Sequence, residues 1–348
     1  MQKILLLLLV GLLAVFKASG QDPQFSQFYA APLYLNPAFA GSNQASRAVL
    51  NYRNQWPELD ANFVTYVGSF DHYFRKYNSG IGVLAFFDKE GSPGFQSYTI
   101  AAQYAYQLHL NEKLTFRPGI QGAFSNRSLN TMGLLFGDQM DDEGNKLGES
   151  NENLLGRPGA SYFDVSAGGI LYSDKFWIGF SAHHMNQPNQ AIVDGETSRM
   201  PVKTSLHIGY RIPLMKNNFG TRVGPLNEQR EVSITPALNF KHQGPFNQLD
   251  AGVYFTYDPL TFGFWYRGIP VRAYKGGAFN NDALIFLMGI RVQDLKIGYS
   301  YDLTVSRLTP STGGAHEISL VYDFYLGYRN QKRKTPPKNV RRMPCPDF

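Results

Sequence analysis

The amino-acid sequence predicts an all-β fold: a closed antiparallel transmembrane β-barrel of about fourteen strands, with an irregular N-terminal segment and a disordered basic C-terminal tail. Three observations support this prediction. Apolar and polar residues alternate with a period of two in many segments, as in 97–108 and 202–212. Beyond residue 20 no apolar run approaches the ~18 residues that a transmembrane helix needs. The expected connections alternate between tight turns and longer loops, which is typical of outer-membrane barrels.

Residues 1–20 have the features of a secretory signal peptide. Lys3 supplies a positive charge, the apolar stretch 4–16 follows, and three small residues end at Gly20. These features predict cleavage between Gly20 and Gln21. A retained N-terminal anchor is the alternative, but the apolar stretch is too short to cross a bilayer as a stable helix. We therefore expect the chain to leave the cytoplasm.

Residues 21–44 precede the first expected strand and show no alternation. Five aromatic residues and the dipeptide Asn36-Pro37 predict irregular structure. This segment is expected either to plug the barrel or to lie along its periplasmic rim. A plug is plausible because a barrel of fourteen strands has a lumen wider than the one that wall side chains fill in small barrels.

Residues 45–328 are expected to form the outer-membrane barrel. The expected strands are longer than the usual 5–6 residues of soluble sheets, and their polar face often carries charged residues at mid-strand, which suits a water-filled lumen. Closure is required because unpaired backbone groups at a sheet edge are too costly in hydrocarbon. The expected strands are 45–53, 62–70, 80–88, 96–108, 113–125, 161–172, 176–184, 202–212, 231–241, 248–257, 260–268, 283–292, 295–304 and 315–328.

The connections predict an orientation with both mature termini in the periplasm. Tight periplasmic turns are expected at 173–175, 258–259 and 293–294, and the long external connections are 126–160, 185–201, 269–282 and 305–314. Two expected periplasmic connections, 71–79 and 213–230, are longer than this pattern allows. They are either misassigned strand boundaries or docking surfaces.

The net charge of +6 does not indicate nucleic-acid binding. Lys3 and Lys17 leave with the signal peptide, and the tail 329–348 alone carries +6, so the body 21–328 carries −2. The tail is too basic and too rich in proline to form a strand or helix, so we expect it to hang in the periplasm. It is either a disordered extension without function or an extended peptide that docks on a partner. Its candidate docking residues are Arg333, Lys334, Arg341, Arg342, Cys345 and Phe348.

The single cysteine, Cys345, excludes an intramolecular disulfide framework. It stands between Pro344 and Pro346, which should keep it extended and accessible. Its thiol either pairs with another chain or is incidental.

No catalytic, metal or cofactor site is expected, so the chain is not predicted to be an enzyme and no cofactor is assigned. The stretch 179–183 fails the G-x-S-x-G pattern at its last position. His183 and His184 are adjacent on an expected strand, should face opposite ways and therefore should not hold one metal. The acidic loop 138–143 fails the EF-hand template. It is expected to be a solvated loop, with bridging to lipopolysaccharide through divalent cations as the alternative.

Charged lumen residues allow two interpretations. Four arginines either tune the ion preference of a pore or pair with carboxylates to stiffen a closed barrel. The arginines are Arg117, Arg211, Arg267 and Arg291, and the carboxylates are Glu231, Asp250, Asp302 and Glu317.

The segment 21–41 resembles the start of mature proteins of the PorP/SprF family, whose pattern is close to D-P-x-F-S-Q-Y…P-L-x-x-N-P-A-x-A-G. The matching residues are Asp22, Pro23, Phe25, Ser26, Gln27, Pro32, Asn36, Pro37, Ala38 and Gly41. The resemblance implies an outer-membrane component of the type IX secretion and gliding machinery of Bacteroidota. It implies as partners the periplasmic ring proteins or one secreted adhesin, beside outer-membrane lipid and lipopolysaccharide. It supplies no catalytic residues, and its motif is a candidate structural or partner-docking element.

Three functions follow as hypotheses. The first is a non-enzymatic barrel that scaffolds the periplasmic ring or assists secretion and surface attachment of an adhesin. The second is a diffusion or uptake channel similar to a porin. The third, a hydrolase embedded in a barrel, lacks a nucleophile–base pair in the sequence.

Overall fold

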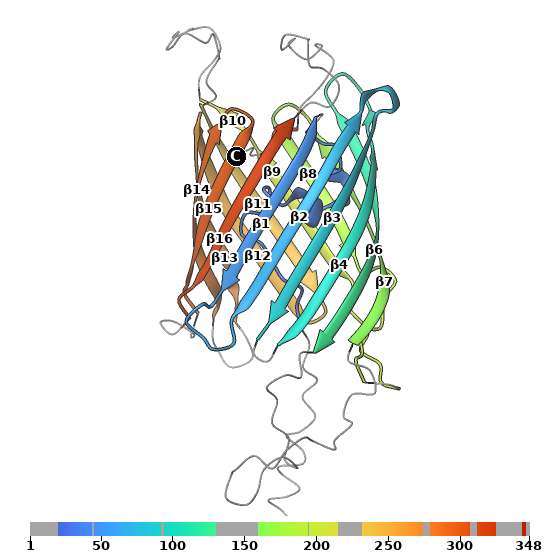
Figure 1. Cartoon of the computed structure of the whole chain (residues 1–348). Coiled ribbons are helices and arrows are strands. Elements are labelled where there is room, and N and C mark those ends of the chain that lie inside the picture. Colours follow the sequence, from blue (N-terminus) through green and yellow to red (C-terminus); the bar gives the residue numbers. More distant parts are fainter. Residues whose placement is uncertain are drawn as a thin grey trace, which may run out of the picture.

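The computed structural model describes residues 20–43, 45–91, 94–129, 159–193, 195–214, 232–273, 279–306, 312–324 and 343–345. In this part the chain forms one antiparallel sheet that closes into a barrel (Figure 1). Closure joins β1 (Ser46–Gln55) to β16 (Ala315–Phe324) through ten residue pairs, from Ser46 opposite Phe324 to Gln55 opposite Ala315. A closed sheet leaves no unpaired edge in the membrane.

Fourteen barrel strands are present in the described residues, as the sequence predicts. Two of them are interrupted. Gln107 separates β4 from β5 and donates its N–H to Asn78 O at 2.7 Å, and Arg211 separates β9 from β10 and donates its N–H to Lys175 O at 2.6 Å. The remaining elements are β2 (Phe63–Phe74), β3 (Ser79–Glu90), β4 (Phe95–Tyr106), β5 (Leu108–His109), β6 (Thr115–Leu129), β7 (Gly159–Tyr172), β8 (Phe176–His183), β9 (Lys203–Tyr210), β10 (Ile212–Pro213), β11 (Val232–Gln243), β12 (Phe246–Tyr257), β13 (Leu260–Ala273), β14 (Phe279–Val292) and β15 (Leu295–Thr304).

The tight turns 173–175, 258–259 and 293–294 lie at one end of the barrel, as expected. We call this the turn end, and the opposite end, which carries the connections 56–62 and 184–202, the loop end. The long connection expected at 71–79 was a misassigned boundary: β2 extends to Phe74, and only the 3-10 turn η2 (Arg75–Tyr77) and Asn78 separate it from β3. Most of 213–230 and of 126–160, with the acidic loop 138–143, lies outside the described residues.

The two faces of the wall differ in polarity. Outward positions are apolar and exposed, as at Leu50, Ile100 and Phe124, which suits contact with lipid. Inward positions carry many buried polar and charged residues, among them Arg53, Asp250 and Glu317. Among the described residues, no helix is long and apolar enough to cross a bilayer.

Candidate functional site

The lumen contains the N-terminal segment. Residues 20–43, which we call the plug, run inside the barrel and appear in blue behind the front strands in Figure 1. The plug has little regular structure: a single turn of helix, α2 (Pro32–Leu35), and the 3-10 turn η1 (Pro37–Phe39). Asn36 connects the two, and its side chain accepts the N–H of Ala38 at 2.9 Å. Proline at the start of each turn and an Asn side chain bonded two residues on explain this compact path.

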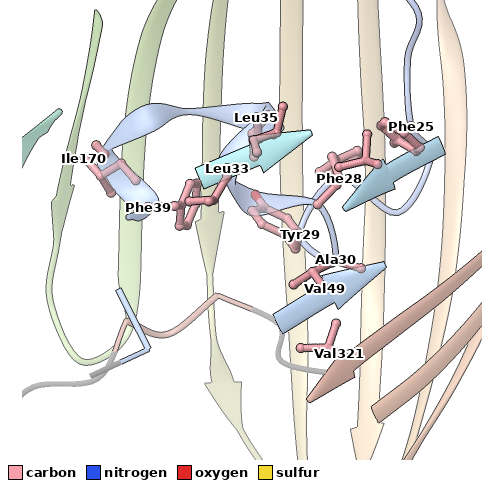
Figure 2. Packing of buried hydrophobic residues seen from close by; sticks show 14 of the residues in the cluster. Phe25, Phe28, Tyr29, Ala30, Leu33, Leu35, Phe39, Val49, Ile170 and Val321 are labelled. Carbon is pink, nitrogen blue, oxygen red and sulfur yellow. The ribbon is translucent and has the colours of Figure 1, made fainter. Parts of the chain in front are cut away.

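The apolar side chains of the plug fit an aromatic patch of the wall. Phe28 packs edge-on against Trp265, with ring centroids 4.7 Å apart. Tyr29 meets Trp177 in the same way at 5.5 Å, and its hydroxyl accepts the Trp177 Nε1–H at 3.0 Å. Figure 2 shows Phe25, Leu33, Leu35 and Phe39 in one cluster with wall residues such as Val49, Ile170 and Val321. This packing excludes water from the apolar part of the contact between plug and wall.

Ser26 and Gln27 join the plug to charged wall residues on β1, β13, β15 and β16. The backbone N–H groups of Ser26 and Gln27 donate to the two Glu317 carboxylate oxygens at 2.7 and 3.0 Å. The Ser26 hydroxyl donates to Asp302 at 2.6 Å and accepts from both Arg53 and Arg267 at 2.9 Å. We call these six residues the Ser26 latch. All of them are buried.

The charges of the latch are balanced locally. Arg53 contacts Asp302 at 2.8 Å and Glu317 at 3.2 Å, and Arg267 contacts Asp302 at 2.9 Å and Asp250 at 2.8 Å. Lys241 approaches Asp250 at 3.5 Å. Three cations therefore face three carboxylates. Burial of charges is tolerated only with such pairing, so removal of one member should be costly.

A second polar cluster, the Asp22 clasp, fixes the start of the plug at the loop end. Asp22 accepts from His184 Nε2 at 2.8 Å, Lys203 Nζ at 2.9 Å and Gln243 Nε2 at 2.8 Å. The other His184 nitrogen, Nδ1, lies 3.0 Å from Asp164 Oδ2. Two carboxylates thus flank one imidazole.

The clasp changes the protonation of its members. Burial opposes a charged His184, but the charge of Asp22 and the hydrogen bonds to Asp164 and Asp22 outweigh it and raise the pKa of His184 from 6.5 to about 9. Burial also opposes a charged Asp22, but Lys203 and His184 outweigh it and hold the pKa of Asp22 well below its usual value. The clasp is therefore an ion cluster at neutral pH.

The plug backbone lies directly on glycines of the wall. A Cβ at Gly80 would collide with the backbone of Ala40 and Gly41, and one at Gly119 with the backbone of Pro37 and Ala38. Arg117 then donates to the carbonyl oxygens of Ala38 and Ala40. Small wall residues thus make room for the plug, and arginine satisfies its carbonyl groups.

All N-terminal candidate docking residues lie in the plug. Phe25, Ser26, Gln27, Asn36, Pro37 and Gly41 are buried, Asp22 and Pro23 are partly buried, and Gly20 and Gln21 at the predicted cleavage point are exposed. The contacts described above are intramolecular. Docking of an external partner on the buried members stays a prediction, and such a partner would first have to displace the plug.

The position of the plug differs from the expected orientation of the termini. Asp22 contacts the loop-end residues His184, Lys203 and Gln243, whereas β16 ends at Phe324 at the turn end. The two lie at opposite ends of the barrel, and the expected periplasmic position of both mature termini stays a prediction. The plug runs from the loop end into the lumen and joins β1 at the turn end.

The described part of the C-terminal tail, residues 343–345, also lies against the plug. Pro344 is buried, and Met343 and Cys345 pack on the apolar cluster that contains Tyr29 and Tyr254. These three residues therefore differ from the expected tail that hangs free and exposes Cys345. Arg333, Lys334, Arg341, Arg342 and Phe348 lie outside the described residues.

The histidine pair corrects another expectation. His183 and His184 were expected to face opposite ways, but both contact the plug: His183 Nε2 lies 3.4 Å from Leu35 O, and His184 contacts Asp22. The reason is that β8 ends at His183 and His184 adopts a positive φ of 58°, so strand alternation no longer applies. In the described part of the chain, no three His, Cys, Asp or Glu side chains are grouped to hold a metal ion.

The lumen arginines separate into two groups. Arg267 pairs with Asp250 and Asp302, and Arg117 binds plug carbonyl groups, so both stiffen a filled barrel. Arg211 donates to Asp174 O, and Arg291 lies 3.7 Å from Asp258, both at the turn end. Glu231 lies outside the described residues. Sequence reasoning missed the roles of Arg53 and Lys203, whose signal was a charged residue at an inward position of an amphipathic strand; it weighed His184 only as a metal ligand, and no local pattern shows its contact with Asp22.

A cavity of about 660 Å³ occupies the loop-end part of the lumen. Its wall comprises inward residues of β3, β4, β6 and β7, its plug side comprises residues 20–23 and Tyr34, and the connection 184–202 contributes a third side. Along β3 the division is clear. Gly80 and Gly82 contact the plug, whereas Phe86, Asp88 and Glu90 line the cavity. A volume of 300–1,000 Å³ is usual for ligand pockets.

Comparison with known proteins identifies the family to which the chain belongs. The family described as "Type IX secretion system membrane protein PorP/SprF" matches residues 17–322. No curated protein matches the sequence.

Similar solved structures include a TodX deltaS2S3 mutant monoaromatic hydrocarbon channel, with 12% identity, a TM-score of 0.46 and coverage of 84% of this chain and 94% of that one. The Acinetobacter baumannii outer membrane protein Omp33 is 10% identical, with a TM-score of 0.41 and coverage of 82% and 100%. These likenesses are too distant to carry an argument about a ligand. The family match covers most of the closed barrel and its plug, and the chain belongs to the PorP/SprF family of type IX secretion system membrane proteins.

Proposed function

We propose that this outer-membrane barrel is a non-enzymatic binding component of the type IX secretion and gliding machinery and not a diffusion channel. The observation that carries the proposal is the plug, which is held by the Ser26 latch, the Asp22 clasp and close contacts with wall glycines. The charged lumen residues of the latch, which a pore would use to select ions, are instead engaged with the plug or with each other. A plugged barrel suits a component that holds a protein partner.

The proposed orientation places the turn end in the periplasm and the loop end outside, following the usual arrangement of outer-membrane barrels. The 660 Å³ cavity then opens toward the cell exterior, and the tail after β16 starts in the periplasm. A role in secretion and surface attachment of an adhesin would use the loop end. A role as a scaffold for the ring would use the turn end and residues 329–348. The cavity favours the first role.

Single-channel recording in planar bilayers tests the plugged state. The purified full chain is expected to give no stable conductance, whereas a variant that lacks 22–43 is expected to conduct, because the plug no longer occupies its lumen. A steady conductance from the full chain, unchanged when the plug is deleted, would support the porin-like alternative and contradict the proposal. Heat-dependent migration on a gel confirms that both barrels are folded.

A pull-down from crosslinked outer membranes separates the two partner roles. Tagged full-length chain is compared with a variant that lacks 329–348. If the tail docks on the ring, its deletion removes ring proteins from the pull-down while the barrel stays folded. If the chain holds an adhesin at the loop end, the adhesin stays in both samples. Absence of both partners from the full-length sample would contradict the proposal.

A further inference from the structure

We propose that the loop-end cavity binds an extended polypeptide segment that places a lysine or arginine side chain at Asp88 and an apolar side chain on the wall beside it. The proposal rests on the proposed function, in which the partner is a polypeptide at the loop end. It adds the site and the chemistry of recognition.

The first argument is the charge of the cavity. Its lining contains five carboxylates, on Asp22, Asp88, Glu90, Asp164 and Glu196, against three cationic side chains, on Arg127, His184 and Lys203, and the one α-ammonium group that the predicted cleavage leaves on Gln21. Asp22 and Asp164 share His184 and Lys203, and Glu90 contacts Arg127 at 3.2 Å. The cavity therefore has an excess of negative charge. A cationic ligand is favoured and an anion is not.

The second argument is Asp88 itself. This residue is only 2% exposed, and one carboxylate oxygen accepts the Thr65 hydroxyl at 2.6 Å. The other oxygen, Oδ2, is buried without a hydrogen-bond partner, and among the described residues no ion pair to Asp88 is formed. A buried carboxyl group without a cation is costly to ionise, so an ammonium or guanidinium group delivered by a ligand would lower that cost.

The third argument is the apolar surface next to Asp88. Leu84 and Phe86 precede Asp88 on the inward face of β3, and Tyr34 of the plug stacks on Phe86 with ring centroids 5.4 Å apart. Across the cavity the connection 184–202 contributes Ile192, Val193 and Met200. The cavity thus pairs one acidic group with an apolar wall, which fits a long cationic side chain and an apolar neighbour in a polypeptide.

The structure of the lumen also favours a bound segment over a transported solute. Along β3 the plug lies over Gly80 and Gly82, between the cavity and the turn end. A ligand that enters from the loop end therefore meets the plug. A free organic amine shares the cationic chemistry of a lysine side chain, so the test must distinguish a free amine from a polypeptide.

Fluorescence polarisation with dye-labelled, capped pentapeptides tests the site on the full chain in detergent. The probes are Gly-Phe-Lys-Phe-Gly and the neutral Gly-Phe-Gln-Phe-Gly, with spermidine and 4-phenylbutylamine as free-amine competitors. The lysine peptide is expected to bind at least about tenfold more tightly than the glutamine peptide, as is usual for a charge-assisted hydrogen bond. Free amines that match the peptide in affinity would overturn the assignment to a polypeptide.

Two cavity variants and one control make the test specific. Asp88→Asn should remove the preference for lysine, and Ser97→Lys should abolish binding, because Ser97 lies opposite Asp88 in the sheet register and the new ammonium would occupy its place. Asp60→Asn removes the same charge from an exposed loop-end position outside the cavity lining and should change nothing.

Unchanged lysine binding in Asp88→Asn, or no saturable binding up to about 1 mM, where association is worth only about 4 kcal/mol, would overturn the inference. That result leaves the conductance and pull-down tests of the proposed function intact. Conversely, a conducting full chain without partners contradicts the proposed function while peptide binding can still be measured.

Discussion

The turn-end and loop-end halves of the wall formed by β3, β4, β6 and β7 differ in the size of their inward residues. The turn-end half has glycine and alanine, as at Gly80, Ala105 and Gly119, and the plug backbone lies on it. The loop-end half has Phe86, Asp88 and Arg127, and a cavity faces it. The same strands therefore bind the plug at one end and leave space at the other end for a second polypeptide segment. Glycine at the points of contact lets the plug backbone approach the wall, because close backbone approach needs small side chains, although the same half also carries the large inward residues Arg117 and Tyr172.

Charge separates the two regions as well. In the Ser26 latch each of the two carboxylates, Asp302 and Glu317, has a cationic partner, whereas Asp88 in the cavity forms no ion pair within the described part of the chain. Satisfied charges hold the plug in place. An unsatisfied charge is what a binding site presents before its ligand arrives.

The largest expected effect comes from Arg267→Met. The substitution leaves Asp250 and Asp302 buried with one cation fewer, so the plugged barrel should lose about 3–5 kcal/mol of stability. Urea titration followed by gel mobility measures the loss. The matched control is Arg127→Met in the cavity half, where the pair with Glu90 is partly exposed and should contribute only about 0–1 kcal/mol. Equal losses of stability in the two variants would contradict the distinction between the paired charges of the latch and the partly exposed pair in the cavity half.

The next effect is the pH dependence of the Asp22 clasp. Because the folded pKa of His184 is raised from 6.5 to about 9, its contribution is complete below pH 6.5 and is lost as the pH rises through about 9. That contribution is at most about 3 kcal/mol. The stabilising contribution of Asp22 has the opposite pH dependence. Because the pKa of Asp22 is lowered, this contribution is lost only in acid.

Melting temperatures between pH 6 and pH 10 measure this dependence. In the His184→Gln variant the melting temperature should not fall as the pH rises through about 9. The variant keeps the charged residues that face His184, namely Asp22, Asp164 and Lys203. Identical pH curves for the variant and the unchanged protein would show that the clasp does not titrate as described.

A third prediction concerns Gly80→Val. The new side chain collides with the backbone of Ala40 and Gly41, which should destabilise the seated plug by about 1–3 kcal/mol and produce channel openings in planar bilayers. Ser97→Leu adds similar volume to the cavity half and should give no channel openings, because Ser97 lines the cavity. Openings in both variants would mean that the plug depends equally on both halves.

The smallest effect is expected for Trp177→Phe. It removes the Nε1–H that donates to the Tyr29 hydroxyl at 3.0 Å and one of the two fused rings of a buried side chain, so the loss should be about 1–2 kcal/mol. Denaturant titration measures it, with Trp177→Leu as a companion that also removes the ring packing. A Phe variant as unstable as the Leu variant would assign the contact to the hydrogen bond instead of to packing.

Much of the barrel could be predicted from local sequence. Alternation over 9–13 residues located all fourteen strands of the described part, and the short turns 173–175, 258–259 and 293–294 were confirmed. Strand ends were less certain, because the pleat continues without a change of pattern where β2 runs on to Phe74. The strand interruptions at Gln107 and Arg211 depend on backbone hydrogen bonds from neighbouring turns, which local pattern does not encode.

The sequence alone determined the class of protein. A period-two pattern and the motif from Asp22 to Gly41 are local features, so they predict an outer-membrane barrel and its family without coordinates. The tertiary structure decided what the motif does inside the molecule. Ser26 lies 291 residues from Glu317 and Asp22 lies 162 residues from His184, and only closure of the sheet brings them within hydrogen-bond distance. In the closed barrel the plug covers the turn-end half of the wall and leaves Asp88 beside an open cavity. The length of the plug and the size of distant wall residues together determine where the plug lies.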